Sequence, residues 1–157
     1  METEKRLKML QLFYAGVLAD SIRNYSEAGI LGTVESKKEK EQKLAAKGQL
    51  AQLNISTPPE LFNTFSEIFG CISWNIEEKS GKITARGNFC MLCAIAKKMD
   101  IEKPCNMYCI NPFNALIEGL ENGYKLRIRN TLWESNSCEF EVISKRPIEY
   151  PLDVLGK

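Results

Sequence analysis

The first half of the chain shows the spacing of apolar residues that is typical of helices. Between residues 4 and 28, apolar residues recur every three or four positions, which predicts a long helix whose wide apolar stripe packs in the core. Residues 34–53 predict a second helix, but its centre is almost entirely polar, with Glu39 and Lys43 at a favourable spacing of four. We expect this second helix to be solvated or to form a mobile arm.

A third helix is predicted by a specific start signal. Thr57 is placed to cap it, Pro58 fits its first position, and Glu60 completes a capping box. Gly70 follows the last apolar residues and is well suited to end the helix.

Strict alternation of apolar and polar residues predicts four strands. Residues 72–78 and 83–89 flank a Lys-Ser-Gly-Lys turn, which predicts an antiparallel hairpin with one apolar face. Residues 124–130 and 138–142 alternate in the same way and predict a second antiparallel pair.

Short helical segments are predicted between the two strand pairs. Residues 90–99 have helical spacing, and residues 105–109 form a helical turn. Asn111 then caps another helix with Pro112 at its first position, running to about residue 118.

These elements together predict an α+β fold: an antiparallel sheet of two hairpins packed against helices, with a helical N-terminal half. At 157 residues the chain is long enough for one domain with a real core. We expect a helical part over residues 1–56, a cysteine-bearing α+β core over 57–146 and a tail over 147–157.

The composition of the chain limits the classes of molecule that it is expected to bind. The chain has 21 Lys and Arg against 20 Asp and Glu, so no large field favours nucleic acid or a membrane surface. No apolar run approaches the roughly 20 residues that span a bilayer. The charged N-terminus is unlike a signal peptide, so we expect a cytoplasmic protein that binds a small molecule.

The absence of histidine limits the chemistry further. A chain with no histidine cannot form a Ser-His-Asp or Cys-His catalytic arrangement. Any metal must be held by cysteine or carboxylate side chains.

Cysteines carry the candidate chemistry. Cys90 and Cys93 are three residues apart, and Cys105 and Cys109 are four apart, so on helical turns each pair presents its sulfurs on one face. If the two faces meet, four thiolates converge, which suits a zinc ion or an iron–sulfur cluster. Cys138 faces inward on its strand.

Other roles for the thiols stay open. Reduced cysteines are common in protein cores, and Cys71, which has no neighbour in sequence, is interpreted in this way. Alternatively the thiols are reactive, because a helix N-terminus at Cys90 or beside Cys109 lowers a thiol pKa.

The order of features from Cys90 onward resembles a known family. The residues that carry the resemblance are Cys93, Pro104, Cys105, Cys109, Asn111, Gly119, residues 126–132 and the Cys138-Glu139-Phe140 strand. They resemble the family named for L-2-amino-thiazoline-4-carboxylic acid hydrolases, and the end of the chain also resembles 4-vinyl reductase domains, which are related to a vesicle-tethering (TRAPP) fold. The resemblance implies an antiparallel sheet with helices on one side and a homodimer.

Two functions follow as hypotheses. The first is a cysteine-dependent hydrolase of C–N or C–S bonds, with Cys109 and Cys138 at its site and thiolate attack or a metal-activated water as its mechanism. The second is a non-enzymatic binding module of the 4-vinyl reductase type that senses a metal, a redox state or an apolar ligand. Basic residues are candidates to receive a substrate carboxylate: Lys97, Lys98, Arg127 and Arg129.

Overall fold

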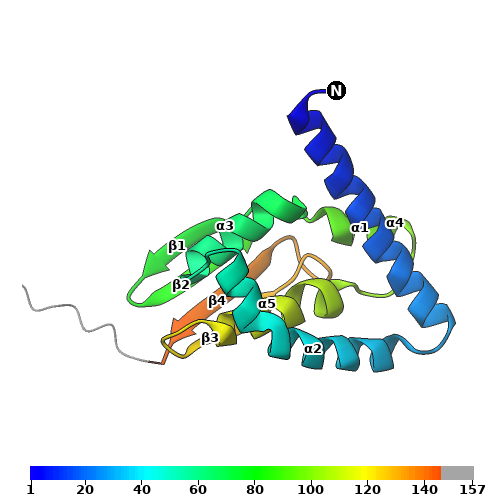
Figure 1. Cartoon of the computed structure of the whole chain (residues 1–157). Helices are drawn as coiled ribbons and strands as arrows, with labels where there is room; N and C mark the ends of the chain where they lie inside the picture. Colours follow the sequence, from blue (N-terminus) through cyan, green and yellow to red (C-terminus); the bar gives the residue numbers. More distant parts are fainter. Residues whose placement is uncertain (146–157) are drawn as a thin grey trace, which may run out of the picture.

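The computed structural model describes residues 1–145 and confirms the predicted α+β fold, whereas the predicted tail lies outside the described residues. Within these 145 residues, five helices and a π-helical turn accompany four strands (Figure 1). In chain order they are α1 (Thr3–Glu27), α2 (Leu31–Gln52), α3 (Pro58–Phe69), β1 (Asn75–Lys79), β2 (Lys82–Gly87), α4 (Met91–Lys98), η1 (Asn106–Ile110), α5 (Asn111–Gly119), β3 (Tyr124–Asn130) and β4 (Cys138–Ser144).

The four strands form one antiparallel sheet in the order β1-β2-β4-β3. The first hairpin turns at Ser80 and Gly81, with φ of 53° and 73°, because a two-residue turn with positive φ matches the twist of paired strands. The two predicted hairpins join where β2 pairs with β4, so that Ala85 lies opposite Phe140 in the middle of the sheet.

One face of the sheet packs against α3 and α5 (Figure 1). Aromatic rings fill the space between this face and the two helices. The ring centroids of Phe62 and Phe113 lie 4.8 Å apart, and those of Trp74 and Phe140 lie 4.9 Å apart. The opposite face is charged: the buried Glu141 carboxylate lies 3.0 Å from Lys82 Nζ and 2.8 Å from Arg129 Nε. Apolar chemistry is therefore concentrated on the helix-covered face.

The start and the end of α3 follow the predicted signals. The Thr57 hydroxyl accepts from Glu60 N at 3.4 Å, and Glu60 Oε2 accepts from Thr57 N at 3.1 Å, which completes the capping box. Gly70 ends the helix at φ 61°, and a Cβ there would clash with the Gln11 side chain of α1. Gln11 Nε2 donates to Glu67 O at 2.9 Å, so α1 fixes the point where the chain leaves α3 toward Cys71.

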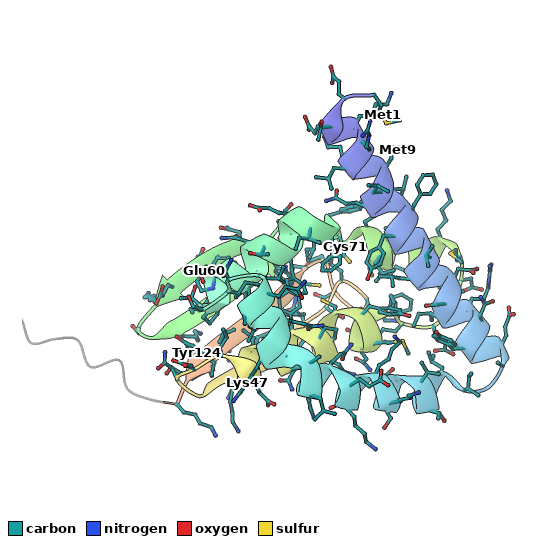
Figure 2. All side chains as sticks on the ribbon, viewed as in Figure 1. Met1, Met9, Lys47, Glu60, Cys71 and Tyr124 are labelled. Carbon is teal, nitrogen blue, oxygen red and sulfur yellow. The ribbon has the colours of Figure 1, made fainter. Side chains whose placement is uncertain are left out.

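The wide apolar stripe of α1 does not pack in the core as predicted. Only the small or branched residues Ala15, Ala19 and Ile22 are buried along this helix. Leu10 is 61% exposed and Phe13 is 64% exposed, and the first turns of α1 extend away from the rest of the chain (Figures 1 and 2). The spacing of apolar residues predicted the helix correctly, but it did not predict that most of these side chains are exposed.

The polar helix α2 packs against the rest of the protein more closely than we predicted. Ala46 and Leu50 are buried against α5, where both approach Gly119 so closely that its Cβ would lie 3.2 Å from each. The Glu39–Lys43 pair on the outer side is solvated, as expected, with a 2.8 Å ion pair. The alternative of a mobile arm is wrong, because α2 packs along α5.

The helix predicted to begin at Asn111 is confirmed, since α5 runs over Asn111–Gly119 with Pro112 in its first turn, but the prediction that Asn111 caps it is wrong. Asn111 has helical φ and ψ of −64° and −43°, and its N–H bonds to Asn106 O across the wider π turn of η1. The π turn precedes Pro112, which lacks the N–H of an ordinary helical bond. Cys105 to Gly119 therefore form one continuous helical run that carries Cys109 on its inner side.

Among the described residues, no helix combines the length and the apolar character needed to cross a membrane.

Candidate ligand cavity

A cavity of about 540 Å³ lies between α1, α2, the end of α3, η1 with α5, and β4. This volume falls in the range of about 300–1,000 Å³ that is typical of small-molecule sites. Aromatic and aliphatic side chains make up much of its wall, among them Phe65, Phe69, Trp74, Phe113, Leu116 and Phe140. An apolar molecule would fit this lining.

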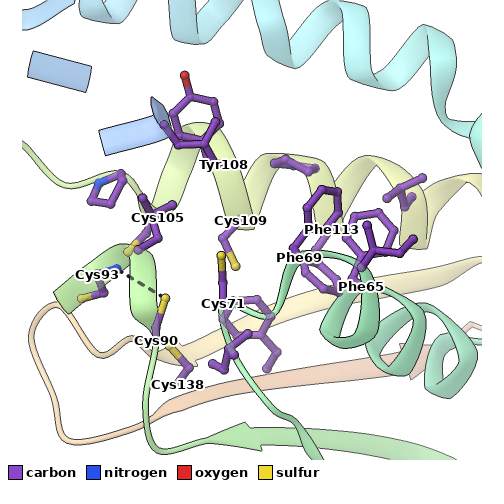
Figure 3. A pocket seen from close by; sticks show the side chains of 18 of the residues that line it. Phe65, Phe69, Cys71, Cys90, Cys93, Cys105, Tyr108, Cys109, Phe113 and Cys138 are labelled. Atoms are coloured by element: carbon purple, nitrogen blue, oxygen red, sulfur yellow. Dashed lines mark hydrogen bonds between the residues drawn. The ribbon is translucent and has the colours of Figure 1, made fainter. Parts of the chain in front are cut away.

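All six cysteines line this cavity, and none of them forms a disulfide. They come from four segments (Figure 3): Cys71 follows α3, Cys90 and Cys93 lie at the start of α4, Cys105 and Cys109 lie on the helical run that begins before η1, and Cys138 begins β4. The structure thus brings together the two predicted cysteine pairs and adds Cys138, which faces inward as predicted. Cys71 was interpreted as a core residue, yet it also borders the cavity.

The arrangement of these thiols does not fit a resident metal. Among residues 1–145, no group of three or more Cys, Asp or Glu side chains is placed to hold a metal ion. A zinc ion or a cluster needs four thiolates close to one centre, with Zn–S distances of about 2.3 Å. Here the sulfurs border a space large enough for a small molecule. The zinc or iron–sulfur site predicted at Cys90, Cys93, Cys105 and Cys109 stays a prediction that has no ligand set in this arrangement.

Burial keeps the thiols protonated. It raises the pKa of Cys90 and of Cys105 to about 12, against an ordinary value of 9.0. Burial also raises the pKa of Cys109 well above that value, and it raises the pKa of Cys138. A neutral thiol is a weak nucleophile and a poor metal ligand, so the wall behaves as a soft apolar surface at neutral pH.

The expected effect of a helix N-terminus on Cys90 is outweighed. Cys90 is the N-cap of α4, and its Sγ accepts from Cys93 N at 3.5 Å, which by itself lowers the thiol pKa. Desolvation is the larger influence, so the net pKa is raised. A helix N-terminus beside Cys109 was also expected to lower the pKa of its thiol. No such N-terminus lies there, because Asn111 continues the helical run that contains Cys109.

Helix α1 covers one side of the cavity and is tied to η1. The Ser21 hydroxyl donates to Leu18 O at 2.7 Å, so the 2.5 Å bond between Ser21 and Tyr108 is donated by the Tyr108 hydroxyl. Tyr14 stacks on Phe69 with ring centroids 5.4 Å apart. Tyr14 and Leu18 both line the cavity, so this helix forms part of its enclosure.

The basic residues predicted to receive a carboxylate lie outside the cavity lining. Lys97 Nζ donates to Leu132 O at 2.7 Å, and Arg129 pairs with Glu141 on the charged face of the sheet. Lys98 and Arg127 do not line the cavity either.

Much of the polar lining comes instead from α2, the helix that was predicted to be solvated. Its side chains Lys38, Gln42, Gln49 and Gln52 border the cavity. In the sequence, Lys38 and Gln42 are four residues apart and so share one face of the helix, but no pattern set them apart from the other polar residues of α2.

Comparison with known proteins shows a similar fold but no similar sequence family. No family model matches this chain, and no curated protein matches it. Among solved structures, the chain is similar to a trafficking protein particle complex subunit 3 from Naegleria fowleri, crystallised covalently bound to palmitic acid. The TM-score is 0.57 at 13% identity, over 89% of this chain and 98% of that chain.

This chain has the fold of that complex subunit. The TRAPP-like part of the resemblance is thus confirmed at the level of the fold. The finer resemblance to the thiazoline carboxylate hydrolases stays a prediction, since no family model matches.

Proposed function

We propose that this protein is a non-enzymatic binding module that holds an apolar molecule, such as a long acyl chain, in the cysteine-lined cavity. The observation that carries the proposal is the composition of the wall: aromatic and aliphatic side chains with six thiols that burial keeps neutral. The similar subunit from Naegleria fowleri holds palmitic acid, which supports an acyl chain as the ligand class.

We further propose that the ligand is held without a covalent bond. A thioester forms when a thiolate attacks an activated acyl group, and the raised pKa values of Cys90, Cys105 and Cys109 leave little thiolate at neutral pH. Apolar contact is sufficient for retention, because each buried CH₂ contributes about 0.8 kcal/mol.

The hydrolase and the metal or redox sensor stay predictions. The hydrolase requires Cys109 or Cys138 as a thiolate or a metal-activated water, and burial raises the pKa of both thiols. The sensor version with a metal requires a ligand set that the described residues do not offer.

The proposal is tested by calorimetric titration of the full chain with palmitate. We expect saturable binding of one molecule per chain. Ile68 lines the cavity and is 42% exposed, so Ile68→Glu places a charge at its rim at little cost to the fold. That variant should bind palmitate about tenfold more weakly, because the carboxylate makes the apolar site polar.

The matched control is Leu44→Glu, which adds the same charge at a residue that is 88% exposed and outside the cavity lining. It should bind palmitate like the parent. Absence of saturable binding in the parent chain would overturn the proposal. An intact mass raised by one acyl group, and restored by hydroxylamine, would show a thioester and overturn the non-covalent part alone.

A further inference from the structure

The lining of the cavity is almost free of charge. Among residues 1–145, its one charged side chain is Lys38 of α2, and no Asp or Glu belongs to it. The thiols of Cys90, Cys105 and Cys109 stay neutral because burial raises their pKa. Lys38 therefore decides the sign of the charge that the lining presents to a bound molecule, and no anionic side chain of the lining repels an anion.

The ammonium group of Lys38 is not held by another described residue. Its neighbour Lys37 lies 3.9 Å from the Glu41 carboxylate. Lys38 itself is half-buried, and no side-chain hydrogen bond or ion pair joins it to the rest of residues 1–145. A lysine carries three donors on a flexible four-carbon stem, so its ammonium group can turn toward a ligand at the cavity.

Other polar groups of the lining already have partners within the protein. The Tyr108 hydroxyl donates to Ser21, and the amide nitrogen of Gln42 donates to a backbone oxygen of η1 at 3.4 Å. The Thr131 hydroxyl donates to Glu134 Oε2 at 2.6 Å. In the described lining, Lys38 therefore combines a positive charge with donors that no protein group uses.

We propose that the apolar molecule in the cavity carries one anionic head group, a carboxylate or a phosphate monoester, which pairs with Lys38. Its hydrocarbon chain then fills the aromatic part of the cavity. This inference rests on the proposed function and narrows its ligand class. It agrees with the non-covalent hold, because an acid held without a thioester keeps its carboxylate. Free fatty acids meet the requirement, whereas neutral esters and alcohols leave Lys38 without a partner.

The test uses three probes with the same number of carbons: dodecanoate, dodecyl phosphate and dodecan-1-ol. Their dissociation constants for the full chain are measured by calorimetric titration. Lys38→Gln removes the charge and keeps a side chain of similar shape. It should weaken binding of dodecanoate about fivefold, because a half-exposed ion pair contributes less than a buried one. It should change binding of dodecan-1-ol less than about twofold.

Two further variants and a salt series serve as controls. Lys38→Arg keeps the charge and should keep the binding of dodecanoate within about twofold of the parent. Lys37→Gln removes the same charge from a side chain that is 76% exposed and outside the lining, and it should leave all three constants unchanged. Added salt should weaken dodecanoate binding to the parent more than to Lys38→Gln, because salt screens a half-exposed ion pair.

The outcomes separate this inference from the proposed function. If the probes bind but Lys38→Gln leaves both anions unchanged, or weakens dodecan-1-ol equally, the inference is wrong and the binding function stands. An equal loss in Lys37→Gln also overturns the inference, because the effect then comes from the net charge of α2. If no probe binds the parent chain, the proposed function fails and the inference fails with it. A loss confined to dodecanoate or to dodecyl phosphate supports an anionic ligand and identifies its head group.

Discussion

Helices α1 and α2 are similar in length and opposite in character. α1 is rich in large apolar side chains, yet Leu10, Phe13 and Val17 are each more than three-fifths exposed. α2 is largely polar, yet Ala46 and Leu50 seat it against α5 and its glutamines border the cavity. Both helices enclose the same space, which α1 reaches through Tyr14 and Leu18.

The difference shows that the number of apolar residues on a helix does not decide how it docks. Ala46 and Leu50 pack closely against Gly119, because the missing side chain of Gly119 permits the approach of α2 to α5. The large side chains of α1 instead form an exposed stripe, defined here by Leu10, Phe13 and Val17. Large exposed apolar surfaces commonly mark an interaction site.

The largest expected effect is a pH dependence of the free energy of unfolding, caused by the thiols of the cavity that both helices enclose. Between pH 7 and pH 9 the free energy of unfolding should change little, and it should then fall steeply toward pH 12. The unfolded chain releases its thiol protons near the ordinary pKa of 9.0, whereas the folded chain keeps those of Cys90 and Cys105 up to about 12. In that window the folded state binds more protons, so its stability falls as pH rises.

Urea unfolding at a series of pH values measures this effect. The double variant Cys90→Ala and Cys105→Ala should show a shallower fall over the same window. An equally steep fall in the double variant would mean that other groups cause it and that the wall is not the dry surface described here.

The second largest effect is expected where α2 packs against α5. Ala46→Asp places a charge in the contact with α5 and should lower the free energy of unfolding by about 3 kcal/mol. Ala45→Asp makes the same change at the exposed neighbouring residue and should cost less than about 0.5 kcal/mol. Equal losses in urea unfolding would show that α2 is a solvated arm after all.

The exposed stripe of α1 tests the predicted homodimer, which we propose forms through this helix. Leu10→Lys should weaken dimerisation at least about tenfold, because a charge replaces a side chain that the second copy would bury. Sedimentation equilibrium measures the dimer constant, and Leu44→Lys on α2 is the control. A parent chain that is monomeric at high concentration would rule out this role for the stripe.

The smallest expected effect is on the link between α1 and η1. Ser21→Ala removes the acceptor of the Tyr108 hydroxyl and should cost about 1 kcal/mol in the free energy of unfolding. Tyr108→Phe should cost a similar amount. The double variant should cost no more than either single change, and additive losses would show that the two groups do not act as a pair.

Much of the fold was predictable because local signals decide it. The capping box at Thr57, the turn at Ser80 and Gly81, and the alternation of Cys138 with Phe140 each involve only residues close in sequence. The helix over Asn111–Gly119 was also predictable, but Asn111 does not cap it, because the π turn of η1 continues the helical run through this residue.

The cavity was only partly predictable. Spacing within each cysteine pair indicated a shared face, and the structure does bring the pairs to one space. The size of that space and the burial of each thiol depend on how α1 and α2 dock, which is decided by contacts far apart in sequence. The raised pKa of Cys90 follows from that docking and not from its place at a helix start.

The most direct test of the central claim is quenching of tryptophan fluorescence by a brominated fatty acid. The chain has two tryptophans, of which Trp74 lines the cavity and Trp133 does not. The Trp133→Phe variant, with Trp74 as its only tryptophan, should be quenched saturably at one ligand per chain, while the Trp74→Phe variant should be quenched little. Equal quenching of both variants, or none in either, would contradict an apolar ligand in the cysteine-lined cavity.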